Sequence, residues 1–144
     1  MTPDNDIHVE IIVPNQTRYL SLIGKIGEDI AKELDQYRGD RETLAYHMNL
    51  VLTEAMTNAI RHANCDDPEK TVRIFISITD TDLTMVVEDS GQGFDINSIR
   101  EPDFETLDEC GRGLFLIRTL MDSVSYRRNT SGDGNLLVMT KRLR

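Results

Sequence analysis

The sequence predicts a two-layer α+β sandwich, in which a mixed, mostly antiparallel sheet carries its helices on one face. Segments rich in β-branched residues occur in pairs around tight turns, as they do in antiparallel hairpins. Helical patterns are grouped between the first strand and the first hairpin, and a further one precedes the last hairpin. The chain has 144 residues, of which 39% are hydrophobic, and no linker or repeat divides it. We therefore expect residues 1–144 to form a single domain.

The first half of the chain predicts one strand and two helices. Residues 7–13 are rich in β-branched side chains and favour a short strand. Residues 17–37 repeat apolar positions at intervals of three and four, which predicts a helix that ends near Gly39. A second helical pattern covers roughly 41–63 and closes at the turn-forming cluster 64–70.

The second half predicts two hairpins separated by a long segment and a helix. The segment 90–113 is acidic and shows no periodicity, and segments of this length are functional lids or disordered. A short apolar helix is expected next. The predicted strands are 71–79 and 83–89 in the first hairpin, and 123–129 and 135–143 in the second, with the helix at 114–122.

Composition excludes several classes of function. The net charge of −9 argues against a broad basic surface for nucleic acid, because such binding depends on Lys and Arg. No run of 18 or more apolar residues predicts a membrane span. Cys65 and Cys110 occur without a secretory stretch, which favours two reduced thiols in a cytoplasmic protein over a disulfide.

Three polar stretches carry the functional signal. In 52–64, Glu54, Asn58 and His62 recur every four residues along one side of the predicted helix. Taken alone, such a stripe is typical of a solvated helix face. In 86–94, a strand ends at Asp89 and is followed by Gly91 and Gly93, which permit a close approach of backbone to a ligand. The alternative interpretation of that stretch is a tight strand exit.

The third stretch, 110–117, places Gly111 and Gly113 directly before the apolar helix. The unpaired N–H groups at a helix N-terminus bind phosphate, so glycines there can form a phosphate site. A flexible hinge before an ordinary helix is the alternative. The spacing matches neither the Walker loop nor the Rossmann pattern.

Together, in this order, the three stretches resemble the ATPase superfamily shared by gyrase, sensor histidine kinases and the mismatch-repair protein MutL. More closely, the chain resembles its compact branch, the bacterial anti-sigma-factor serine/threonine kinases. The resemblance covers essentially the whole chain, and 111–122 is especially close to this branch. It implies the histidine-kinase-like ATPase fold, ATP and Mg²⁺ as cofactors, and a nucleotide lid over about 94–110.

The resemblance also implies a role for each site residue. Asp89 would accept a hydrogen bond from the adenine amino group. Asn58 would offer its amide oxygen to Mg²⁺, and Glu54, one turn earlier, would act as general base toward the attacking hydroxyl. Gly91 and Gly93 would lie on the adenine side, whereas the phosphate-side residues would be Gly111 and Gly113 together with the adjacent Arg112 and Leu114.

Three further expectations concern the surroundings of this site. His62 would either touch the phosphates or serve as a simple cap or surface group. Arg112 could reach the γ-phosphate, because a guanidinium forks onto phosphate oxygens, and Phe94 would cover the nucleotide as part of the lid. Many relatives carry Gly-Thr where this chain has Gly134 and Asn135, so we expect a local change in pocket contacts without loss of the pocket.

The resemblance implies a protein serine/threonine kinase that binds a sigma factor and phosphorylates an anti-anti-sigma partner, and thus regulates transcription in a stress response. Relatives commonly dimerise, so a homodimer is a further expectation. An alternative is a nucleotide-binding module that only sequesters its partner. A sensor histidine kinase fragment fits less well, because no dimerising hairpin with a phosphoacceptor His precedes the site helix.

Overall fold

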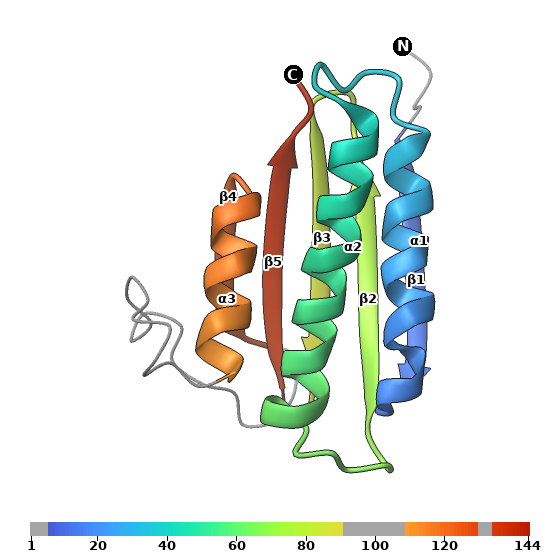
Figure 1. Ribbon diagram of the computed structural model, residues 1–144. Coiled ribbons are helices and arrows are strands. Elements are labelled where there is room, and N and C mark those ends of the chain that lie inside the picture. The colour runs from blue at the N-terminus through green and yellow to red at the C-terminus, as the bar shows by residue number, and fades with distance from the viewer. Residues whose placement is uncertain (1–5, 91–108, 130–133) are drawn as a thin grey trace.

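A five-stranded sheet with three α-helices on one face forms the part of the chain that the computed structural model describes, residues 6–90, 109–129 and 134–144 (Figure 1). In chain order the elements are strand β1 (Ile7–Pro14), the 3-10 turn η1 (Thr17–Tyr19), helices α1 (Leu20–Lys32) and α2 (Arg41–Asn58), the π-helix η2 (Ala59–Ala63), strands β2 (Thr71–Ile78) and β3 (Asp82–Asp89), helix α3 (Glu109–Leu120), and strands β4 (Ser123–Arg128) and β5 (Asn135–Arg142). The predicted α+β sandwich is confirmed.

The strand order is β1-β2-β3-β5-β4, and every pairing among the described strands is antiparallel. The expectation of a mixed sheet is therefore wrong. The reason is that β5 returns between β3 and β4, so it runs opposite to both, although a helix connects β3 to β4. Both predicted hairpins form, β2 with β3 and β4 with β5.

The hydrophobic core lies between the helices and one face of the sheet. Alternate residues of β2 and β3 are buried, as period-2 patterning requires. Met48 and Leu52 of α2 and Ile74 and Ile76 of β2 are almost completely buried in this core. The sheet therefore serves as a rigid platform under α2, the helix that carries Glu54 and Asn58.

Helix α1 carries glycine where it packs against α2. A Cβ atom built on Gly27 would lie 2.5 Å from Cδ1 of Leu52. Helix α1 ends at Lys32, earlier than the predicted end near Gly39. The next N–H groups bond to carbonyls three residues back, as Leu34 does to Ala31, and these tighter turns end the α-helix.

The second helical region matches the predicted span of 41–63, but its last turn is not α-helical. Asp40 caps its start, because the Asp40 side chain accepts a hydrogen bond from the N–H of Glu42. From Ala59 onward the helix is of the π type, and the N–H of Asn64 bonds to the carbonyl of Ala59. The four-residue stripe through Glu54 and Asn58 therefore does not continue with the same geometry beyond residue 58.

Helix α3 begins at Glu109, five residues before the predicted start at residue 114. Most of the expected lid, 94–110, lies outside the described residues. None of the helices in the described part of the chain is both long and apolar enough to cross a bilayer.

Candidate functional site

Helix α2 presents Glu54 and Asn58 toward α3, where a glycine takes the place of a side chain. Asn58 is only 3% exposed, and Glu54 is half-buried. A Cβ atom on Gly113 would lie 2.7 Å from Oε2 of Glu54 and 3.6 Å from both terminal atoms of the Asn58 amide. The interpretation of this stripe as a solvated face is therefore wrong at Asn58, because α3 covers it.

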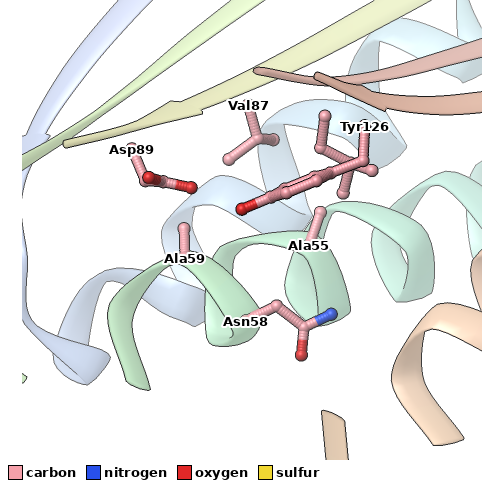
Figure 2. Close-up of a pocket in the computed structure, with 7 residues that line it drawn as sticks. Ala55, Asn58, Ala59, Val87, Asp89 and Tyr126 are labelled. Atoms are coloured by element: carbon pink, nitrogen blue, oxygen red, sulfur yellow. The ribbon is translucent and has the colours of Figure 1, made fainter. Parts of the chain in front are cut away.

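The amide of Asn58 has unused hydrogen-bonding capacity. Its Nδ2 atom is buried and has no hydrogen-bond partner among the described residues. Leaving such a group unpaired costs about 1–3 kcal/mol, so a ligand at this position would gain an interaction that the folded chain leaves open. In Figure 2 this amide points to the side of α2 opposite to the side chains of Ala55 and Ala59.

A hollow lies between α2 and the sheet, and Asn58 is one of the residues that line it. Its cavity volume is about 10 Å³, which is room for about one water molecule. The residues that line it are Ala55, Asn58, Ala59, Val87, Asp89, Tyr126 and Leu137. The two alanines leave room beneath the strands, and Figure 2 shows the Tyr126 hydroxyl pointing across the hollow toward Asp89. The hollow is lined mainly by apolar side chains, and its polar lining residues are Asn58, Asp89 and Tyr126.

The carboxylate of Asp89 is held in place from the neighbouring strand. Asn135 of β5 lies opposite Asp89 in the sheet, and its Nδ2 donates a hydrogen bond of 2.9 Å to Oδ1 of Asp89. Both residues are buried. Gly134 has a φ of +107° and packs against the carbonyl of Asp89 so closely that a Cβ atom there would collide with it. The Gly134-Asn135 pair thus orients the carboxylate that faces the hollow.

The phosphate-side glycines differ from the prediction. They were expected just before a helix, but α3 already includes Gly111 and Gly113. In an α-helix that begins at Glu109, the free N–H groups belong to the first turn, and Gly113 lies beyond it. In this structure Gly113 leaves space beside Glu54, and its contact with a phosphate stays a prediction.

The remaining predicted site residues differ in burial, and several lie outside the described part of the chain. Arg112 is exposed on α3. Leu114 is 0% exposed and packs in the hydrophobic core, and its contact with the nucleotide stays a prediction. Gly91, Gly93 and Phe94, and the side chain of His62, lie outside the described residues.

Sequence reasoning missed two contributors to the site. Tyr126 reaches the hollow because it alternates with Val124 along β4, and its partner in the register is Leu137. That alternation and the pairing of β4 with β5 were predicted from the sequence, but the pairing of β5 with β3, which brings Tyr126 to the same hollow as Asp89, was not. Asn135 was noted only as a departure from related sequences, and its bond to Asp89 depends on the pairing of β3 with β5.

Comparison with known proteins identifies the family of the chain. Residues 16–141 match the family described as "Histidine kinase-like ATPase domain". The chain is 30% identical over 141 residues to the serine-protein kinase RsbW of Halalkalibacterium halodurans, a match that covers 92% of this chain and 82% of that protein. It is 28% identical over 148 residues to the serine-protein kinase RsbW of Bacillus subtilis, covering 97% and 88% of the two chains.

A solved structure shows the same fold. The histidine kinase domain of the blue-light activated histidine kinase of Erythrobacter litoralis superposes with a TM-score of 0.54 at 21% identity. The match covers 91% of this chain and 62% of that one. From the matched sequence family and from these relatives, the chain belongs to the histidine kinase-like ATPase family, in the branch that includes the serine-protein kinases RsbW.

Proposed function

We propose that the protein is an ATP-dependent serine/threonine kinase and anti-sigma factor, which binds a sigma factor and phosphorylates an anti-anti-sigma partner in the cytoplasm. The observation that carries the proposal is the meeting of three features at α2. These are the apolar hollow that ends at Asp89, the buried amide of Asn58 with its unused donor, and the carboxylate of Glu54 beside a glycine. The RsbW relatives, which are serine-protein kinases, support the reaction type.

The lining of the hollow has the chemistry that a flat aromatic base needs, although its cavity volume of about 10 Å³ holds only about one water molecule in this structure. Ala55, Ala59, Val87 and Leu137 offer apolar surfaces from the helix and the sheet. Asp89 accepts the hydrogen bond from the adenine amino group, and the bond from Asn135 to its Oδ1 holds the carboxylate in the orientation that this requires. A base that lacks the amino group would lose this charged hydrogen bond, so the site distinguishes adenine from such bases.

Glu54 and Asn58 of α2 suit the phosphates and the metal ion. Mg²⁺ prefers oxygen ligands and keeps several waters, so one amide oxygen from Asn58 together with phosphate oxygens is a fitting ligand set. When bound, Mg²⁺ neutralises charge that develops on the transferred phosphoryl group. Glu54 lies one turn before Asn58 and accepts the proton of the attacking serine or threonine hydroxyl. Gly113 leaves the space in which that carboxylate stays near Asn58.

The test compares phosphoryl transfer from Mg-ATP to a candidate anti-anti-sigma protein by wild type and by Glu54→Gln. Loss of a general base predicts a rate lower by about 10²- to 10⁴-fold, with ATP affinity retained. The matched control is Glu42→Gln, which makes the same change at an exposed position in the first turn of α2. Equal rates for Glu54→Gln and wild type would refute the assignment of Glu54 as the base.

If neither protein transfers phosphate although both bind ATP, the kinase proposal fails and a sequestering module remains. Sigma-factor binding is tested separately, by capture of the bound proteins on immobilised wild type from the native cell. Sedimentation of the purified protein tests the proposed homodimer.

A further inference from the structure

A buried asparagine joins the end of the site helix to the strand that carries Asp89. Asn64 follows η2 and is 0% exposed. Its Nδ2 donates to Oδ1 of Asn15 at 3.0 Å and to the carbonyl of Thr71 at 3.3 Å. Its Oδ1 accepts a hydrogen bond of 3.0 Å from the N–H of Ser90, the residue directly after Asp89. The side chain thus contacts the start of β2 and the end of β3 at once.

The Asn64 side chain takes the place of a backbone pair that is absent between β2 and β3. The register of β2 with β3 ends at the pair Arg73 and Glu88, and two residues further it would bring Thr71 opposite Ser90. The two strands do not pair there. Instead the amide of Asn64 bridges them, with its donor on the Thr71 carbonyl and its acceptor on the Ser90 N–H. A side-chain amide has the same donor and acceptor as a peptide group, so it satisfies both strands while they separate.

The backbone directly after Asn64 has an uncommon conformation. Cys65 and Asp66 follow it with φ angles of 53° and 55°, which are unusual for residues other than glycine. The N–H of Asp66 bonds back to the carbonyl of Ile60, and the N–H of Asn64 bonds to that of Ala59. Conformations of this kind persist where the surrounding contacts determine them.

We propose that Asn64 is a positioning residue of the nucleotide site: it fixes the exit of β3 at Ser90 and thereby aims Asp89 into the hollow. The inference rests on the proposed ATP site. Asp89 is then held from both neighbouring strands. Asn135 and Gly134 hold it on the β5 side, and Asn64 holds the following peptide on the β2 side.

The alternative is that Asn64 only stabilises the turn that connects it to β1. Asn15 provides the matched control, because it is also buried and belongs to the same network, where it donates to the carbonyl of Asp67 at 3.0 Å. The side chain of Asn15 bonds to Asp67 and Asn64, whereas Ser90 bonds to Asn64, so Asn15→Ala loosens the turn and keeps the bond from Ser90 to Asn64. Both variants are compared by amide hydrogen exchange without nucleotide, and by ATP titration at a temperature where each is fully folded.

For Asn64→Ala we expect faster exchange of the Ser90 amide, and an ATP dissociation constant raised about five- to tenfold, the effect of one lost hydrogen bond. For Asn15→Ala we expect a protected Ser90 amide and an ATP affinity within about twofold of wild type, although its stability falls to a similar degree. Equal changes in ATP affinity for both variants, or an unchanged affinity for Asn64→Ala, would overturn the proposal.

Two further measurements keep the outcome clear. If Asn64→Ala does not fold, Asn64→Asp replaces it, because a carboxylate keeps the acceptor for the Ser90 N–H but has no N–H donors. We then expect the Ser90 amide to remain protected from exchange. Rapid exchange of that amide would refute the proposal that residue 64 holds Ser90. If Asp89→Asn binds ATP as wild type does, the proposed nucleotide site fails. The exchange rate of Ser90 in nucleotide-free protein still shows whether Asn64 holds the strand exit.

Discussion

Replacing Gly113 with alanine separates the stability of the fold from the chemistry at Glu54. The new Cβ atom would lie 2.7 Å from Oε2 of Glu54, whereas ordinary van der Waals contact begins at about 3.4 Å. The carboxylate therefore has to move by about 0.7 Å or more. Because Oε2 is the far end of a flexible side chain, it can rotate away without disturbing the backbone.

The two effects of this substitution have opposite signs. Alanine in place of glycine within a helix favours folding by about 0.5–1 kcal/mol. Forcing Glu54 off its rotamer opposes this by about 0.5–1.5 kcal/mol. The free energy of unfolding should therefore change by less than about 1 kcal/mol. Displacement of a catalytic group by about 1 Å lowers the rate by about 10²-fold, so kcat should fall by that factor.

The assay combines urea unfolding, ATP titration and phosphoryl transfer from Mg-ATP for four proteins: wild type, Gly113→Ala, Glu54→Gln and the double variant. If Gly113→Ala acts through Glu54, the double variant is no slower than Glu54→Gln alone. If the rate of the double variant is lowered by the product of the two single-variant factors, this coupling is refuted and Gly113 serves the phosphates directly. An unchanged rate in Gly113→Ala would remove Glu54 from the chemistry.

Three further predictions concern the nucleotide pocket, a helix cap and the helix interface. Asp89→Asn should raise the ATP dissociation constant by about 10- to 100-fold, the effect of losing a charged hydrogen bond, with unchanged urea unfolding; an unaltered affinity would exclude Asp89 from the site. Hydrogen bonds from the Thr43 hydroxyl and, to a smaller extent, from the Glu42 N–H hold the pKa of Asp40 below its ordinary value. The ionised cap therefore stabilises the fold at neutral pH, and this stabilisation is lost as the pH falls through the lowered pKa. Asp40→Ala should therefore be less stable than wild type at pH 7 in urea unfolding, and a difference that persists undiminished in acid would contradict the cap. Gly27→Ala should lower the free energy of unfolding by about 1–3 kcal/mol because it meets Leu52, and Leu52→Val should recover part of that loss if the clash is its cause.

The positions of the helices and strands were largely predictable, because they depend on local pattern. Alternating apolar residues in 71–79 and 83–89 predicted the first hairpin, and the spacing of apolar residues in 17–37 and 41–63 predicted α1 and α2. The ends of these elements were less certain. Helix α1 stops at Lys32 because tighter turns carry Leu34 into the core, and such packing is not encoded in a periodic pattern.

The candidate site was predictable only in part. The sequence by itself determined the residue types of the motif and their four-residue spacing on one helix, which brought Glu54 and Asn58 to adjacent turns. Only the tertiary structure decided that Gly113 lies against Glu54, that Asn135 orients Asp89, and that Asn64 bridges to Ser90. The physical reason is that these contacts join segments far apart in the chain, so their geometry depends on strand order and helix packing and not on local propensity.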